Sequence, residues 1–346
     1  MKTKDFYFDL PQNLIAQVPS DKRGEDRLLV LGKKDGSIID SNTQELASFI
    51  DEDTIIVVNN SKVRLARVYG LSDTGSNVEF LFLEENADTS WKCIVSRTKK
   101  QKLGRKYTFT SKDGKASYTA TCVNVNEDST RDILFDTVIT EEFFTSCGHV
   151  PLPPYIKRED TFSDETRYQT IYSKNLGSVA SPTAGLHFTK EILDEIKSKN
   201  IKVYEVTLHV GTGTFLPVRS EELEEHAMHY ERYSISEEVA KAINEAKKAG
   251  KKVMAVGTTA VRCVESSTKE DGEVVAGEGK TNIFIYPGYK FKTIDTLLTN
   301  FHTPESTLLM LVSAFSTKDN ILNAYRHAVE NSYRFFSYGD AMLIKE

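Results

Sequence analysis

The sequence predicts an α/β protein with a large mixed α/β domain and a small antiparallel β-barrel domain inserted into it. The length of 346 residues is sufficient for two domains. Between residues 67 and 147, short β-rich runs recur at close spacing, and helical patterns are nearly absent until Glu141. On both sides of that stretch, buried strand patterns alternate with amphipathic helix patterns. We therefore assign residues 1–66 and 148–346 to the large domain and residues 67–147 to the insert.

The composition is that of an ordinary soluble enzyme. Hydrophobic residues make up 39% of the chain and charged residues 27%, no apolar run can span a bilayer, and the N-terminus lacks a signal peptide's apolar core. We expect a cytoplasmic protein with no membrane partner. The four cysteines form no C-x-x-C pair, so neither a metal site nor a redox motif is expected. The net charge of −6 argues against nucleic-acid binding over the whole surface but allows a local basic patch.

The first elements are a hairpin, a short helix and a buried strand. The Asp35-Gly36 turn predicts the hairpin, and Asn42 with Glu45 resembles the capping box of a helix that ends near Ile50. The apolar run 54–58 is typical of a buried strand.

Two polar stretches flank these elements. The charged loop 19–27 has the composition of a solvated turn. The cluster 59–64, which includes Lys62 and Arg64, follows the buried strand, and ligand groups gather at such strand ends in open α/β sheets.

The insert and the segment after it each leave two interpretations open. The basic run 97–102 can contact phosphate or can be a solvated loop. In the proline-rich, tyrosine-rich segment 149–172, Arg167 and Tyr168 can contact RNA, or the segment can be a stiff crossover with buried tyrosines.

Two stretches rich in glycine, threonine and histidine follow. Residues 177–189 leave the backbone bare and lead into a helix over 190–197 with Thr189 as its N-cap, an arrangement that can hold an anionic ligand group or be a structural loop. The strand 202–208 ends in the second stretch, 209–215, where a G-x-G lets a ligand approach the backbone.

Helices are expected over 221–229 and 236–249, the second with Ser236 as its N-cap. His226 and His229 lie one turn apart, like half a metal site, but no further ligand lies nearby in the sequence.

The strand 253–256 then turns through Gly257-Thr258-Thr259 into a helix carrying Arg262, which resembles an anion cradle without the lysine of a P-loop. A charged, mobile loop over 267–280 and a strand over 282–286 follow.

The C-terminal part begins with a polar segment before an apolar helix. Thr303 as N-cap and Pro304 at the first helical position predict a helix through Phe315, with His302 and Glu305 at its N-terminus. A helix over 319–331, an aromatic and polar cluster over 333–340 and a last strand over 341–344 complete the chain.

Long, irregular motifs spread over nearly the whole chain carry a resemblance. They include residues 150–156, 167–170, 181–189, 209–215, 257–262, 299–310 and 333–340. In these motifs the chain resembles the S-adenosylmethionine:tRNA ribosyltransferase-isomerase family of the queuosine pathway. Ser181, Thr303 and Tyr230 depart from the family pattern, and none of them removes an ionisable group with an assigned role.

The resemblance implies an unusual use of S-adenosylmethionine as a ribosyl donor. The ribosyl unit is transferred to 7-aminomethyl-7-deazaguanine at the tRNA wobble position and isomerised, which gives epoxyqueuosine and releases adenine and methionine. S-adenosylmethionine is then a co-substrate, no bound cofactor or metal is implied, and tRNA is the partner of a chain that we expect to be a monomer.

Proton transfers in this reaction require ionisable groups, and histidine suits them near neutral pH. The resemblance therefore gives a catalytic set, without individual roles, of His187, His209, His302 and Glu305. Expected contacts to S-adenosylmethionine are Pro182, Thr183, Gly185, Gly211, Gly213, Thr214, Thr258, Asn300 and, for the methionine carboxylate, Arg262. Expected contacts to tRNA are Lys62, Arg64, Arg167 and Tyr168.

Two other functions compete with this one. An S-adenosylmethionine-dependent RNA methyltransferase lacks support, because the first strand is not followed by a glycine-rich turn, a helix and an acidic residue. A non-catalytic RNA-binding protein does not explain three histidine-bearing polar motifs outside the insert.

Overall fold

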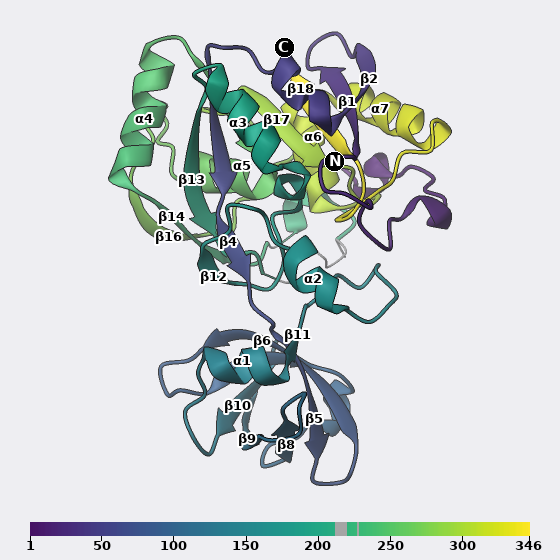
Figure 1. Ribbon diagram of the computed structural model, residues 1–346, viewed down its shortest axis with the longest axis vertical. Coiled ribbons are helices and arrows are strands. Elements are labelled where there is room, and N and C mark those ends of the chain that lie inside the picture. Colours follow the sequence, from purple (N-terminus) through teal and green to yellow (C-terminus); the bar gives the residue numbers. More distant parts are fainter. Residues whose placement is uncertain (212–219, 227) are drawn as a thin grey trace.

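A mixed sheet of nine strands, counted over the described residues 1–211, 220–226 and 228–346, forms the centre of the larger part of the molecule. In this computed structural model the strand order is β16-β14-β13-β3-β15-β17-β18-β1-β2 (Figure 1). β13, β3, β15 and β17 run parallel to one another, as do β1 and β18. The strands are β1 (Arg27–Gly32), β2 (Ile38–Asn42), β3 (Thr54–Asn59), β13 (Lys202–Leu208), β14 (Glu231–Ile235), β15 (Lys252–Val256), β16 (Gly277–Thr281), β17 (Thr296–Asn300) and β18 (Ala341–Lys345).

Helices cover both faces of this sheet, as the alternation along β3 requires. Ile55 and Val57 pack with α4, α5, α6 and α7, whereas Ile56 and Val58 pack with α3 and the 3-10 helix η3. Successive side chains of a strand point to opposite faces, so an apolar strand needs cover on both. The helices are α3 (Lys190–Ser198), α4 (Glu237–Lys248), α5 (Thr258–Ser266), α6 (Thr307–Phe315) and α7 (Lys318–Glu330), with 3-10 helices η1 (Thr3–Phe6), η2 (Gln12–Leu14), η3 (Thr43–Phe49), η5 (Thr183–His187) and η7 (Leu223–Glu225).

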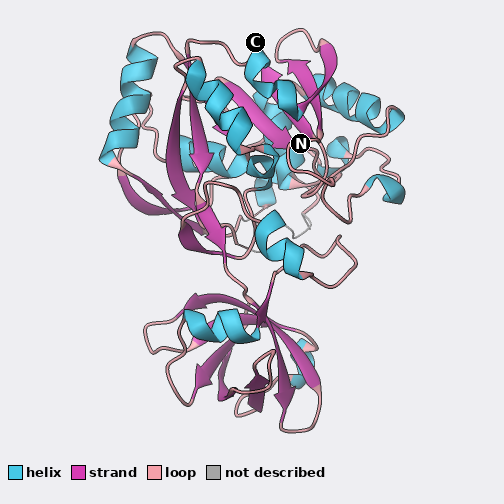
Figure 2. Ribbon diagram, in the orientation of Figure 1, coloured by secondary structure: helices cyan, strands magenta, loops and turns pink. Residues whose placement is uncertain are grey.

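The smaller part is an antiparallel barrel with its own aromatic core. The barrel closes because β5 pairs with both β6 and β8, and α1 packs Phe143 and Phe144 against Phe82. Its elements are β5 (Arg67–Ser72), β6 (Asn77–Glu85), β7 (Trp91–Val95), η4 (Thr98–Lys100), β8 (Lys106–Thr110), β9 (Ser117–Val125), β10 (Arg131–Phe135) and α1 (Glu141–Cys147). Figure 2 shows this nearly all-strand unit beside the helix-rich larger part. The predicted fold class is confirmed, and we propose residues 67–147 as the limits of the inserted domain.

Short connections join the two parts. β11 (Gly148–His149) leaves the barrel paired antiparallel with β5, so the chain enters and leaves the barrel side by side (Figure 1). β4 (Ser61–Val63) pairs parallel with β12 (Asn175–Ser178), and α2 (Phe162–Arg167) lies in the proline-rich segment that follows the barrel. In the described part of the chain, no helix is long and apolar enough to cross a membrane.

The predicted N-caps of two helices and the glycine that ends one of them are confirmed. Thr189 caps α3 by accepting a hydrogen bond from the amide of Ile192, and Ser236 caps α4 in the same way. Gly250, with φ of 73°, follows α4, where the left-handed conformation favours glycine.

One predicted helix start is confirmed in position and another is wrong. The helix η3 begins after Asn42 and ends before Ile50 as predicted, but it is a 3-10 helix, Asn42 makes no side-chain cap, and Glu45 accepts a hydrogen bond from Ser41 at 2.6 Å. α6 begins at Thr307 with Ser306 as its N-cap, because Glu305 has a φ of 57° that no right-handed helix tolerates.

Two further elements between residues 221 and 286 differ from prediction. Among the described residues of 221–229 the one helical element is the short η7, which ends before His226, so His226 and His229 lie outside it. The strand expected over 282–286 is absent from these described residues, and β16 lies instead at the end of the predicted mobile loop, where it pairs with β14. The pairing satisfies backbone groups that a free loop would expose.

Candidate functional site

A cavity of about 290 Å³ lies beside the carboxyl ends of β15 and β17, which are parallel neighbours. Its walls come from residues 180–184, the turn 257–259 between β15 and α5, the segment 299–306 between β17 and α6, and residues 336–337. Polar loops at the carboxyl ends of parallel strands are a common place for a ligand. The motifs that are far apart in the sequence therefore meet around one cavity.

The cavity collects about a third of the predicted site residues. Those that line it are Pro182, Thr183, Thr258, Asn300, His302 and Glu305. The lining residues that sequence reasoning did not assign include Tyr155, Ser181, Thr259, Phe336 and Ser337. Within the described residues, the lining has a single carboxylate, Glu305, and contains neither lysine nor arginine.

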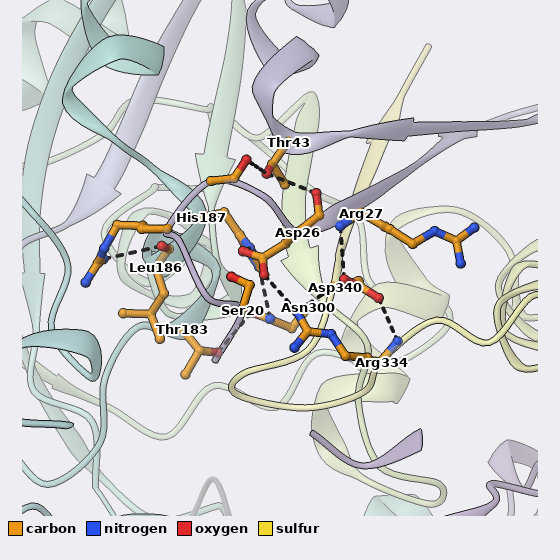
Figure 3. Close-up of polar contacts among 12 residues, drawn as sticks. Ser20, Asp26, Arg27, Thr43, Thr183, Leu186, His187, Asn300, Arg334 and Asp340 are labelled. Atoms are coloured by element: carbon orange, nitrogen blue, oxygen red, sulfur yellow. Dashed lines mark hydrogen bonds and ion pairs between the residues drawn. The ribbon is translucent and has the colours of Figure 1, made fainter. Parts of the chain in front are cut away.

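A chain of hydrogen bonds leads from a buried carboxylate to the cavity wall (Figure 3). The Nδ2 atom of Asn300 donates to the carbonyl oxygen of Phe336 at 3.2 Å, which fixes the orientation of the amide, and lies 3.1 Å from Nε2 of His187. Because Nδ2 only donates, Nε2 is the acceptor and the proton of the neutral ring is on Nδ1. Nδ1 then donates to Oδ2 of Asp26 at 2.7 Å.

The same chain orients a hydroxyl at the cavity. Oγ1 of Thr183 lies 3.0 Å from Oδ1 of Asn300, and since a carbonyl oxygen only accepts, the hydroxyl donates. Thr183 is therefore left with its lone pairs for a ligand in the cavity, so it presents an acceptor.

His187 itself does not reach the cavity. Its side chain is 2% exposed, and both ring nitrogens are engaged by Asp26 and Asn300. It was predicted as catalytic, but in this structure it is a positioning residue that acts through Asn300.

Asp26 is the point where three segments of the chain meet. Besides His187, its carboxylate contacts the guanidinium of Arg334 at 2.9 Å, and the amide of Arg334 donates to Asp340 at 2.6 Å (Figure 3). Burial alone raises the pKa of Asp26, but the His187 ring, a hydrogen bond from Ser20 and the charge of Arg334 together lower it. The carboxylate is therefore ionised at neutral pH.

His302 and Glu305 face the cavity from the segment before α6. Nε2 of His302 lies 2.8 Å from Oγ1 of Thr299, and burial lowers the pKa of His302 to about 3, so the ring is neutral at physiological pH. The left-handed backbone of Glu305 is held by a hydrogen bond from its amide to the carbonyl of Phe6 at 3.1 Å. An irregular backbone of this kind is typical of functional sites.

Arg262 is not available to a ligand in the way that was predicted. It is buried on α5, forms a very short ion pair with the buried Glu231, and is absent from the cavity lining in the described chain. Glu231 also accepts a hydrogen bond from the amide of Gly211 at 3.0 Å. Arg262 is thus paired through Nη1, whereas its buried Nη2 has no hydrogen-bond partner in the described chain.

The remaining predicted residues of the central motifs lie elsewhere. His209 is half-buried outside the cavity, and burial together with Arg64 and Arg232 lowers its pKa. A side chain at Gly185 would collide with the hydroxyl of Tyr172, so this glycine serves internal packing rather than ligand approach. Gly213 and Thr214 lie outside the described residues.

The predicted RNA contacts divide into one free side chain and three engaged ones. Lys62 is exposed. Arg64 pairs with Glu141 at 2.6 Å, and Arg167 donates to backbone carbonyls of Ser20 and Asp21. Tyr168 is fully buried, so RNA cannot stack on it in this structure, and its prediction is corrected to a core residue.

The solvated turn predicted over 19–27 is also wrong. Asp26 is buried, and Arg23 donates to the carbonyls of Leu186, Thr166 and Gln169. The local sequence does not reveal this burial, because the partners of Arg23 and Asp26 lie more than 100 residues further along the chain.

Comparison with known proteins extends over the whole chain. The family model described as "Queuosine biosynthesis protein" matches residues 3–344. A protein of Treponema denticola named S-adenosylmethionine:tRNA ribosyltransferase-isomerase is 51% identical, with 99% of this chain and 100% of that protein aligned. A protein of the same name from Clostridioides difficile is 48% identical, with 100% of each chain aligned.

A solved structure agrees in sequence and fold. The crystal structure of S-adenosylmethionine tRNA ribosyltransferase from Thermotoga maritima is 35% identical and superposes with a TM-score of 0.56. The alignment covers 98% of this chain and 99% of that one.

The first prediction concerns Asp26. Asp26→Asn removes the anion that faces Arg334 and His187, and we expect the free energy of unfolding in urea to fall by about 2 kcal/mol. The exposed Asp194→Asn is the control and should change stability by less than about 0.5 kcal/mol. Equal effects of the two substitutions would contradict the role of Asp26, and a double variant with Arg334→Gln should lose less than the sum of its parts.

The second prediction uses the lowered pKa of His302. As the pH falls, the unfolded chain binds this proton near pH 6.5 and the folded protein only near pH 3, so wild-type stability falls across that window. His302→Gln removes the effect. Between pH 7.5 and pH 5 we expect the wild type to lose about 2 kcal/mol more stability than the variant. Parallel stability curves for the two proteins would show that His302 is not held neutral by burial.

Proposed function

Because the chain belongs to the queuosine biosynthesis protein family, we propose that it is an S-adenosylmethionine:tRNA ribosyltransferase-isomerase. It transfers and isomerises the ribosyl moiety of S-adenosylmethionine onto 7-aminomethyl-7-deazaguanine at the tRNA wobble position. The products are epoxyqueuosine in tRNA, adenine and methionine. The observation that carries this proposal is the near-complete alignment, at about half of all positions, with two relatives of that name.

In this proposal S-adenosylmethionine is a co-substrate and tRNA carrying the modified base is the macromolecular partner. The enzyme works in the cytoplasm, as a monomer, without a bound cofactor. The concave site supports the small-molecule half of the reaction, because it is of a size and polarity suited to a small ligand.

The chemistry asks for a base, for help in the departure of adenine, and for a neutral amine as nucleophile. The positive sulfonium acidifies the neighbouring ribose carbon, from which the base takes a proton. We assign Glu305 as this base, since it is the single carboxylate among the described lining residues. His302 lines the same cavity, and its neutral ring lies beside the hydroxyl of Thr299.

Other residues of the cavity lining are placed to bind and orient the substrate. Asn300 and Thr183 are held by the chain that starts at Asp26, so their dipoles are fixed before substrate arrives. Preorganised dipoles stabilise developing charge without reorganising during the reaction. For tRNA, we retain the exposed Lys62 as a phosphate contact.

A product assay tests the function directly. Purified protein is mixed with S-adenosylmethionine and tRNA bearing 7-aminomethyl-7-deazaguanine, and the products are followed by mass spectrometry. We expect adenine, methionine and a nucleoside that has gained the ribosyl-derived mass. S-adenosylhomocysteine with a methylated nucleoside would instead identify a methyltransferase, and tight, salt-sensitive tRNA binding without turnover would identify an RNA-binding protein.

Glu305→Gln tests the assignment of the base. The amide keeps the size of the side chain but cannot take a proton, so we expect the rate of adenine release at saturating substrates to fall at least ~100-fold. Glu225→Gln, an exposed position on η7, is the matched control and should retain the wild-type rate. If Glu305→Gln has the wild-type kcat, Glu305 is not the base.

A further inference from the structure

The N-terminus of α5 opens into the cavity with free backbone donors. Gly257, with φ of 86°, is its N-cap and supplies no side-chain hydrogen bond. The amides of Ala260 and Val261 already donate to the carbonyl of Gly257, which leaves the first two N–H groups, of Thr258 and Thr259, without helical partners. These donors carry the positive end of the helix dipole.

The neighbouring helix at the same cavity is different. Ser306 caps α6, since its hydroxyl accepts from the amide of Leu309 at 3.2 Å and donates to the carbonyl of Thr303. This cap satisfies the amide of Leu309, whereas the amides of Thr307 and Leu308, like those of Thr258 and Thr259, have no acceptor among the described residues. The two helix ends differ in their hydroxyls, because that of Ser306 is engaged within the protein.

Two buried hydroxyls beside the α5 terminus lack partners. Oγ of Ser181 and Oγ1 of Thr259 make no hydrogen bond within the described chain, although the two residues are only 5% and 8% exposed. Both residues line the cavity. A buried hydroxyl without a partner costs about 1–3 kcal/mol, so such groups are normally satisfied, here by whatever enters the cavity.

The charge of the cavity indicates what this terminus binds. Among the described lining residues there is no basic side chain, His302 is neutral and Glu305 is acidic, so the helix N-termini are the positive regions of the wall, and of these α5 is the one without a side-chain cap. Arg262, the predicted partner of a carboxylate, is already paired with Glu231. An anionic group of the ligand has its favourable position at Thr258 and Thr259.

We propose that the N-terminus of α5 binds the carboxylate of the methionine part of S-adenosylmethionine, through the amides of Thr258 and Thr259 and the hydroxyls of Thr259 and Ser181. This inference rests on the proposed function, which supplies the substrate. With the carboxylate at α5, the rest of the substrate lies in the cavity that Glu305 also lines.

The test compares S-adenosylmethionine with its decarboxylated analogue, which differs by the carboxylate alone. The kcat and KM for both donors are measured with the same tRNA for the wild type and for Thr259→Val. Valine replaces an unpartnered hydroxyl with a methyl group, so the fold should be preserved. Thr303→Val, the same change at a lining residue outside α5, is the matched control.

We expect the wild type to favour S-adenosylmethionine by ~100-fold in kcat/KM, which is the size of two or three charge-assisted hydrogen bonds. Thr259→Val should reduce that preference ~10-fold by raising KM for S-adenosylmethionine alone, and Thr303→Val should leave the preference within ~2-fold of wild type.

Three outcomes would overturn the proposal. If Thr259→Val is active and its preference between the two donors is unchanged, the carboxylate does not bind at the N-terminus of α5. A rise in KM for tRNA, with the donor preference unchanged, identifies the anion as a tRNA phosphate instead. Absence of any wild-type turnover of S-adenosylmethionine overturns the proposed function itself and the subsite with it.

Discussion

The buried carboxylate of Asp26 is the interaction on which the site depends. A carboxylate removed from water must be paired, and Asp26 meets that requirement with His187, 161 residues away, and with Arg334, 308 residues away. By satisfying one charge, the protein ties the N-terminal loop, the 181–189 motif and the C-terminal segment together. The hydrogen-bond directions in Asn300 and Thr183 follow from that pairing, and they decide which groups a ligand meets.

Two segments of the cavity lining contribute different kinds of groups. On one side the helix α5 offers bare amides and hydroxyls, while the ionisable groups come from the irregular segment before α6. The glycine at position 257 and the left-handed Glu305 are the local departures from regular structure that make each side possible. The charged groups that stabilise the fold, such as Arg262 with Glu231, are kept out of the cavity.

The sequence was sufficient for most of the fold and for six of the residues that line the cavity, but not for the pairing of the buried charged side chains. Strands such as 54–58 and the barrel strands have periodic patterns that depend on few distant contacts, and the caps Thr189 and Ser236 are local. The charged loop 19–27 resembled a solvated turn because the partners of Asp26 and Arg23 are brought there only by the folded sheet. For the same reason Arg262 was predicted to bind a ligand, although in the folded protein it forms an ion pair with Glu231.

The pairing of β1 with β18 has a consequence for how the protein is made. β18 is synthesised long after β1, and Arg334 follows Asp26 by 308 residues. The barrel, in contrast, is closed by strands within residues 67–135 and can fold while the rest is still being synthesised. The large sheet and the Asp26 network are complete only once residues 334–345 have been added. A chain that is cut between residues 147 and 334 therefore keeps every strand of the barrel but lacks Arg334 and Asp340, so its site is incomplete.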